Sequence, residues 1–163
     1  MGECAHVRYA KMQHPVFQAV LGKFRRRFAP GSEVLWVSEQ RSRLVRLGHS
    51  RRNLLELPLP EGIDLPNIVL LQRKLSRMFL VEVIGAGGLL NSTRCAELRR
   101  GLRGFRLKLV FITASASRSE LRDRLHEIAW QTHVWIANEP NHIIHFDCKP
   151  HLANATLQPN TRK

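Results

Sequence analysis

Apolar residues recur at every fourth position between residues 16 and 28, which predicts an amphipathic helix. Its apolar side is formed by Val16, Val20, Phe24 and Phe28. Turn residues follow at positions 29–32, and the β-branched and aromatic run Val34–Val37 after them predicts a strand. A second short apolar run, Leu44–Leu47, is a candidate to pair with that strand.

The next part of the chain alternates short structured runs with proline. Arg51–Leu57 predicts a short helix that ends at Pro58, because proline lacks an amide hydrogen and its ring clashes with the preceding turn. Further prolines and a glycine predict a stiff connection up to residue 66. Ile68–Leu71 then predicts a strand.

A continuous apolar run, Met78–Ile84, contains a single acid, Glu82. Such a run predicts a central strand that carries a buried carboxylate. A glycine-rich loop follows at residues 85–88, and Asn91–Ser92 can cap a helix that extends to Leu102.

The C-terminal part of the chain predicts one more helix and three more strands. Ser117 or Ser119 caps the predicted helix Glu120–Trp130. The strands are Leu107–Thr113, Val134–Ala137 and Ile143–Phe146, the last two joined as a hairpin. The order of all these elements predicts an α/β fold with a mixed β-sheet flanked by helices.

The composition limits the class of protein. With 163 residues, 44% of them hydrophobic and 24% charged, the chain can bury one core, and disorder of its bulk is excluded. Its longest apolar run is far shorter than the roughly 20 residues that cross a bilayer. No apolar run of signal-peptide length starts the chain, so we expect a cytoplasmic protein that does not bind membranes. Three cysteines without a CxxC pair indicate neither a disulfide scaffold nor a zinc ribbon.

The charge balance points to an anionic partner. The chain has 26 Lys and Arg against 13 Asp and Glu, a formal net charge of +13, which favours nucleic acid. Arginine dominates, and its planar fork suits phosphates and guanine edges. Arg41, Arg43 and Arg94 are the candidate DNA contacts. A solubilising surface and a basic module for acidic proteins are the alternative interpretations.

The presence of Glu82 in an apolar strand requires an explanation, because burying an unpaired carboxylate costs free energy. In a hairpin of the two neighbouring strands, position 67 would lie beside position 82. Metal-dependent nucleases place acids on neighbouring strands in this way, where they hold Mg²⁺ against the scissile phosphate. The alternative is a salt bridge between Glu82 and one of the many arginines.

The C-terminal half carries a more specific pattern. Residues 128–137 read IAWQTHVWIA, and residues 142–146 read HIIHF. Together with FAPGSEVL at residues 28–35 and FLVE at residues 79–82, these motifs resemble the catalytic domain of the BsuBI/PstI family of type II restriction endonucleases. That family belongs to the PD-(D/E)XK nuclease superfamily. Arg94, followed by Glu97 and Leu98, also matches its pattern.

The resemblance implies a restriction-endonuclease-like domain over residues 28–148. The residues themselves predict a helical segment over residues 1–27 before it and a disordered tail over residues 149–163 after it. The resemblance also implies Mg²⁺-dependent hydrolysis of double-stranded DNA at a palindromic site by a homodimer, without a nucleotide cofactor. A non-catalytic DNA-binding remnant of the same fold is the rival interpretation.

The departures from the family pattern fall at the chemistry. By resemblance, Glu82 and Asn67 hold the metal and act in catalysis, but Asn67 stands where the family has an aspartate. Thr93 occupies the place of a catalytic lysine, and Glu39, a further candidate metal ligand, that of an aspartate. Either a substitute ligand completes the site, or the nuclease is weak or inactive. The candidate substitutes are Glu39, Asp64 and Glu97.

The histidines, the tryptophans and the glycine-rich loop give weaker indications of function. His142 and His145 would point to opposite faces of a strand, so they do not predict a shared zinc ion. The resemblance implies that Trp130 and Trp135 belong to the apolar framework, so they are predicted to lie in the core, with base stacking as the alternative. The glycines at residues 85–88 lack the ending of a phosphate-binding loop.

Overall fold

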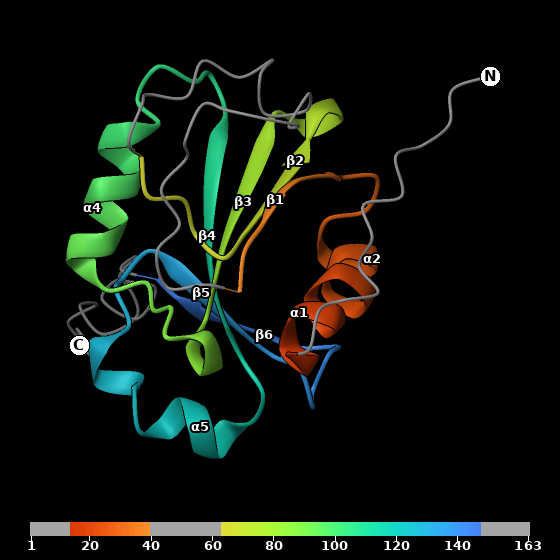
Figure 1. Ribbon diagram of the computed structural model, residues 1–163, viewed down its shortest axis with the longest axis vertical. Helices are drawn as coiled ribbons and strands as arrows, with labels where there is room; N and C mark the ends of the chain where they lie inside the picture. The colour runs from red at the N-terminus through yellow and green to blue at the C-terminus, as the bar shows by residue number, and fades with distance from the viewer. Residues whose placement is uncertain (1–13, 40–62, 148–163) are drawn as a thin grey trace, which may run out of the picture.

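The computed structural model describes residues 14–39 and 63–147, and a six-stranded sheet lies at its centre (Figure 1). In spatial order the strands are β1 (Glu33–Val37), β2 (Ile68–Gln72), β3 (Arg77–Val83), β4 (Lys108–Ser115), β5 (Thr132–Ile136) and β6 (Ile143–Phe146). β3, β4 and β5 are parallel, whereas the other neighbouring pairs are antiparallel. The predicted mixed sheet flanked by helices is confirmed.

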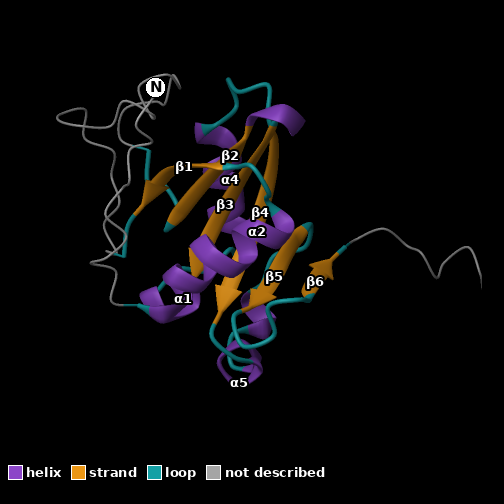
Figure 2. Cartoon of the chain, turned by 90° about the vertical axis from the view of Figure 1, so that its right-hand side faces the viewer, coloured by secondary structure: helices purple, strands orange, loops and turns teal. Residues whose placement is uncertain are grey.

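One face of the sheet is covered by the helical segment 15–28 (Figure 2). This segment consists of α1 (Pro15–Ala19), a π-helical turn (Val20–Phe24) and α2 (Arg25–Phe28). Val16, Val20 and Phe24 are buried and pack with Phe79 of β3. The predicted helix and its apolar side are therefore confirmed.

The opposite face is covered by α4 (Ser92–Gly101) (Figure 1). As predicted, its first residues are capped by Asn91, whose side-chain oxygen accepts a hydrogen bond of 2.8 Å from the backbone N–H of Arg94. Leu98 is buried in the same cluster as Leu80 of β3. Helix α4 is thus fixed against the sheet both by its cap and by its apolar side.

Strand β3 separates these two layers, because successive side chains of a strand point to opposite faces. Phe79 and Val81 pack with the α1–α2 segment, whereas Leu80 packs with α4. Glu82 shares the α4 side and is 0% exposed. The prediction of a central strand with a buried carboxylate is confirmed.

The predicted helix Glu120–Trp130 is wrong in length. Helix α5 covers only Arg118–Arg122, and a separate 3₁₀ turn covers Leu125–Glu127. Beyond this turn the chain is extended, and the N–H of Ala129 donates to the carbonyl of Leu90 (2.9 Å). A continued helix would lose this bond and would carry the chain away from the start of β5.

The same change of chain direction explains why one of the two tryptophans is exposed and the other is buried. Trp130 lies on the turn before β5, is 67% exposed and contacts the ring of Phe146 (centroids 6.1 Å apart), so its predicted place in the core is wrong. Trp135, on β5, is 0% exposed and donates from Nε1 to the carbonyl of Pro140 (3.2 Å). Its core position is confirmed.

Several predictions fall outside the described residues. They concern the strand Leu44–Leu47, the helix Arg51–Leu57, the candidate DNA contacts Arg41 and Arg43, and the tail from residue 149. Across residues 14–39 and 63–147, no helix has the length and apolar character needed to cross a membrane.

Candidate functional site

Asn67 and Glu82 lie side by side at one end of the sheet. The antiparallel register of β2 and β3 pairs Ile68 with Val81, so Asn67 lies opposite Glu82 at the next position. Opposite residues of an antiparallel pair point to the same face. Both side chains are 0% exposed. The structure therefore brings together the two residues that the spacing had pointed to.

Both ends of the Asn67 amide form hydrogen bonds with the backbone. Its Oδ1 accepts a hydrogen bond from the N–H of Val83 (2.8 Å), and its Nδ2 donates to the carbonyl of Ser38 (3.0 Å). The backbone N–H of Ser38 in turn donates to the carbonyl of Asn67 (2.8 Å). Asn67 thereby joins the end of β1 to the end of β3. An aspartate in the same place could accept from Val83 but could not donate to Ser38.

The loop after β3 passes directly over this pair. A Cβ added to Gly88 would overlap Oδ1 of Asn67 and Oε2 of Glu82, so only glycine fits this position. The N–H of Gly88 donates to the carbonyl of Val83 (2.9 Å), which holds the loop down. The backbone of the loop therefore closes one side of the space between the amide and the carboxylate.

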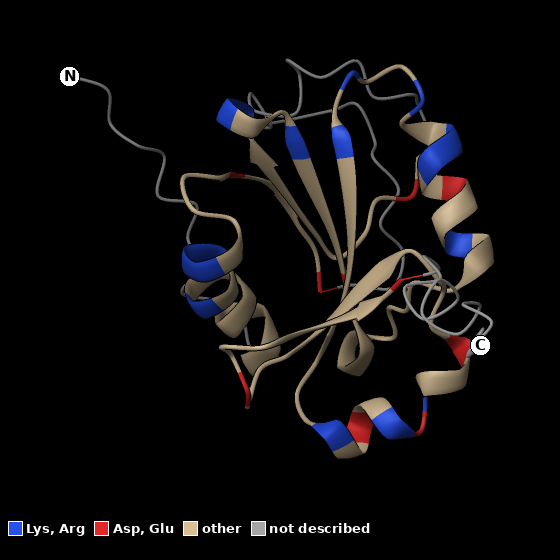
Figure 3. Cartoon of the chain, turned by 180° about the vertical axis from the view of Figure 1, so that it is seen from behind, with Lys and Arg blue, Asp and Glu red and all other residues tan. Residues whose placement is uncertain are grey.

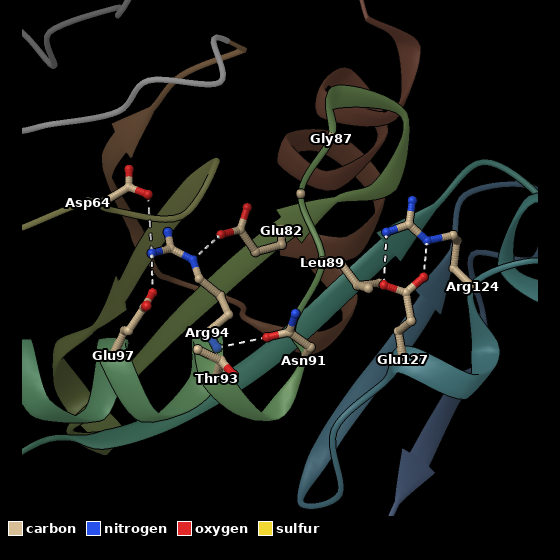
Figure 4. Close-up of a pocket in the computed structure, with 11 residues that line it drawn as sticks. Asp64, Glu82, Gly87, Leu89, Asn91, Thr93, Arg94, Glu97, Arg124 and Glu127 are labelled. Carbon is tan, nitrogen blue, oxygen red and sulfur yellow. Dashed lines mark hydrogen bonds and ion pairs between the residues drawn. The ribbon is translucent and has the colours of Figure 1, made fainter.

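Glu82 pairs with Arg94 from the first turn of α4. Arg94 Nε lies 2.9 Å from Oε1 of Glu82, while its Nη1 lies 3.3 Å from a carboxylate oxygen of Asp64 and 3.7 Å from one of Glu97 (Figure 4). The Arg94 side chain is only 12% exposed. The salt-bridge alternative for Glu82 is thus realised, and one guanidinium gathers three carboxylates.

These groups line a pocket of about 350 Å³ on the α4 side. Thr93 also lines it, beside the cap of α4 (Figure 4). Across the pocket, Arg124 Nε donates to Oε1 of Glu127 (2.6 Å), and this hydrogen bond lowers the pKa of the Glu127 carboxyl below its ordinary value. The charges that face the pocket come from Asp64, Glu82, Glu97, Glu127, Arg94 and Arg124. We call this the acidic pocket.

Glu39 lies elsewhere. Its Oε1 accepts a hydrogen bond from the backbone N–H of His14 (3.2 Å), at the start of α1, and Glu39 does not line the acidic pocket. Of the three candidate substitute ligands, Asp64 and Glu97 line the same pocket as Glu82 and pair with the same arginine, whereas Glu39 lies apart.

Sequence reasoning missed Gly88, Arg124 and Glu127 as parts of the site. The glycine-rich loop was noted, but a close approach of its backbone to buried oxygens leaves no mark in a periodicity pattern. Arg124 and Glu127 are spaced i, i+3, which is a signal for an ion pair on a helix. Nothing in that spacing indicates which pocket the pair faces.

The donor set fits a guanidinium better than Mg²⁺. Mg²⁺ takes six oxygen ligands in near-octahedral geometry and favours carboxylates. Here the only buried carboxylate of the pair is held by Arg94, and the Asn67 oxygen is held by a backbone N–H. Within the described residues, no three His, Cys, Asp or Glu side chains form a group that could hold a metal ion.

Comparison with known proteins extends this picture. The family model described as "BsuBI/PstI restriction endonuclease domain" matches residues 9–149. The chain belongs to the BsuBI/PstI restriction endonuclease family. The type II restriction enzyme BsuBI of Bacillus subtilis is 24% identical over 132 residues, and the type II restriction enzyme AplI of Arthrospira platensis is 34% identical over 89 residues. Among solved structures, the SdaI restriction endonuclease matches with a TM-score of 0.70 and 27% identity.

The matches confirm the family resemblance and cover only part of each relative. They span 81% of this chain but 42% of BsuBI, 55% of this chain but 28% of AplI, and 91% of this chain but 45% of SdaI. The chain therefore spans less than half the length of the family members it matches.

Proposed function

We propose that this chain is a duplex-DNA-binding domain of the restriction endonuclease fold in which Mg²⁺-dependent phosphodiester cleavage is greatly weakened or lost. One observation carries the proposal: the amide of Asn67 is used on both sides by the backbone, at the position where the family has a metal-binding aspartate. The residue serves as a structural bridge between strands.

Charge supports the same conclusion. An aspartate and a glutamate side by side would present two negative charges to a divalent cation, whereas Asn67 and Glu82 present one. That one charge is already matched by Arg94 at 2.9 Å. A cation that binds there would have to share this fully buried carboxylate with the guanidinium or displace it. The place of the family's lysine is taken by Thr93, which removes a further cation that could stabilise the transition state.

DNA binding rests on other features. The net charge of +13 and the membership of a family of DNA-cutting enzymes both favour duplex DNA as the partner. Each phosphate contact releases a counterion, so affinity falls steeply with salt. We expect log affinity for a short duplex to fall linearly with log salt in a fluorescence anisotropy titration. A flat response, or tighter binding to an acidic polypeptide than to DNA, would contradict the proposal.

Cleavage is tested by restoring the family's residue at each of the two positions that depart from its pattern. Asn67→Asp and Thr93→Lys are combined, and nicking of supercoiled plasmid is followed in Mg²⁺ and in Mn²⁺. We expect the double variant to cut at least about tenfold faster than the parent, which corresponds to roughly 1.4 kcal/mol of transition-state stabilisation. Adding Glu82→Gln to the double variant should abolish the gain. A parent that already cuts at full rate in Mg²⁺ would contradict the proposal.

A stability measurement separates metal binding from activity. Asn67→Asp loses the hydrogen bond to Ser38 and adds a second buried charge, so we expect the unfolding free energy to fall by about 1–3 kcal/mol without metal. Mg²⁺ should recover part of this loss by binding only the folded state. The parent should show no such Mg²⁺-dependent stabilisation.

The gathering of Asp64 and Glu97 around Arg94 favours a second candidate function, an active nuclease with substitute ligands. In that case the parent cuts DNA, and Asp64→Asn or Glu97→Gln lowers its rate. If both variants match a parent that does not cut, the substitute site is excluded.

The homodimer that the resemblance implies is also a proposal. A two-fold symmetric pair of chains would match a palindromic DNA site. Sedimentation equilibrium with and without duplex DNA tests it, and a monomer under both conditions would contradict it.

A further inference from the structure

A second hollow lies on the opposite face of the sheet, beside the end of α2. Its volume is about 220 Å³. The floor is apolar and includes Phe28 at the end of α2 and Phe79 of β3, while the polar groups are Arg77, Lys108, His133 and His145. We call this the basic hollow.

Strand register explains why the cations meet. Arg77 and Lys108 are the first residues of β3 and β4, and they are direct neighbours in the parallel ladder (Figure 3 shows basic residues at the adjacent starts of these strands). Because side chains alternate along a strand, Arg77 shares its face with Phe79, and Lys108 shares its face with Ile112. Ile112 in turn pairs with His133 of β5. All these residues therefore face the same side of the sheet.

The two histidines form the far wall of the basic hollow. His133 and His145 are opposite each other in the β5–β6 hairpin, and their Nδ1 atoms are 2.8 Å apart. One Nδ1 must carry the hydrogen and the other must accept it. Burial lowers the pKa of His133, the neighbouring His145 and Lys108 lower it further, and Asp147 opposes the shift. Lys108 is thus close enough to act on the histidine electrostatically.

No carboxylate lines the basic hollow in the described part of the chain. Among the described residues, neither Arg77 nor Lys108 takes part in an ion pair. Like charges that converge raise the energy of the folded protein. Asp147 opposes this effect at His133, and an anion bound between the cations would lower the cost further. A small hollow with an apolar floor and cations on its walls suits a compact anion.

We propose that the basic hollow binds a phosphate group, held by Arg77 and Lys108 and capped by the His133–His145 pair. The phosphate comes either from a DNA backbone or from a free phosphate-bearing molecule, and the chemistry of recognition is the same for both. The site lies at the opposite end of β3 from Glu82 and on the opposite face, so it does not depend on the proposed fate of the acidic pocket.

The test uses the histidine ring signals of the full chain in NMR. The protein is titrated with inorganic phosphate at constant ionic strength, and in a second arm with a short DNA duplex. Phosphate next to the rings should raise the pKa of His133. Lys108→Gln should weaken phosphate binding by about tenfold, as expected for the loss of a charged hydrogen bond.

The matched control is Arg100→Gln, which removes one exposed charge from α4 on the other face of the sheet. It should leave phosphate binding unchanged. If DNA is the source, the duplex shifts the His133 signals, and Lys108→Gln reduces the salt slope of DNA affinity by about one. If a free molecule is the source, phosphate shifts the signals and the duplex does not. If neither ligand raises the pKa of His133, or if Lys108→Gln behaves as Arg100→Gln does, the proposal is wrong.

Discussion

The acidic pocket and the basic hollow lie on opposite faces of one sheet, and they differ in whether their cations have acidic partners within the chain. In the acidic pocket, each arginine has carboxylate partners within the chain, with Arg94 2.9 Å from Glu82 and Arg124 2.6 Å from Glu127. In the basic hollow, lysine, arginine and two histidines converge, and none of its described lining residues is an acid. In the first region the two arginines are matched by acids of the chain, which outnumber them. In the second region the described lining holds cations and no acid, so a bound anion would match them.

Burial explains the difference. Glu82 is 0% exposed, and a charge without water needs a partner of opposite sign inside the fold. Lys108 is exposed, so water can solvate it when no ligand is bound. A buried carboxylate that is already held by a guanidinium is a poor ligand for a metal ion, whereas exposed cations with no acid among the described lining residues can hold an anion.

The largest effect is expected from breaking the internal pair. Arg94→Ala removes the guanidinium that lies 2.9 Å from the buried Glu82 carboxylate, so we expect the unfolding free energy to fall by about 3 kcal/mol in urea titrations near neutral pH. Arg100→Ala, an exposed arginine on the same helix, should change it by no more than about 0.5 kcal/mol. Equal losses in the two variants would mean that Arg94 acts through helix α4 in general and that Glu82 does not depend on it.

A smaller effect is expected in the basic hollow. Lys108→Ala removes a repelling charge and no ion pair seen in the described residues, so we expect a change within about 0.5 kcal/mol, with stabilisation as the favoured sign. The measurement is the same urea titration without phosphate. A loss comparable to that of Arg94→Ala would break the contrast between the two regions.

The smallest effect is a pH dependence from His133, whose folded-state pKa lies below the ordinary value of 6.5 because of burial and nearby positive charge. The unfolded chain takes up this proton more readily, so the stabilisation is complete above about pH 6.5 and is lost as pH falls through the lower folded pKa. Urea titrations at about pH 7.5 and pH 5 should show a smaller loss in Lys108→Gln than in the parent. An identical loss would show that Lys108 does not act on the histidine.

Local patterns were enough to predict most elements and part of the site. The helix from Val16 to Phe28, the cap at Asn91 and the buried acid at Glu82 follow from spacings of a few residues, and the structure confirms all three. The helix Glu120–Trp130 failed because a backbone bond to Leu90, distant in sequence, overrides the local apolar spacing. Trp130 was misplaced for the same reason.

The sequence by itself determined the α/β class, the family, and the neighbouring positions of Asn67 and Glu82, because strand periodicity and hairpin spacing are local properties. Only the tertiary structure decided that Arg94 is the arginine that pairs with Glu82, and that the Asn67 amide is used on both sides. It also decided that His133 meets His145 across a hairpin, in a hollow that Lys108 also lines. These contacts depend on strand register and on which face a helix packs against, and both are set by burial of the whole core.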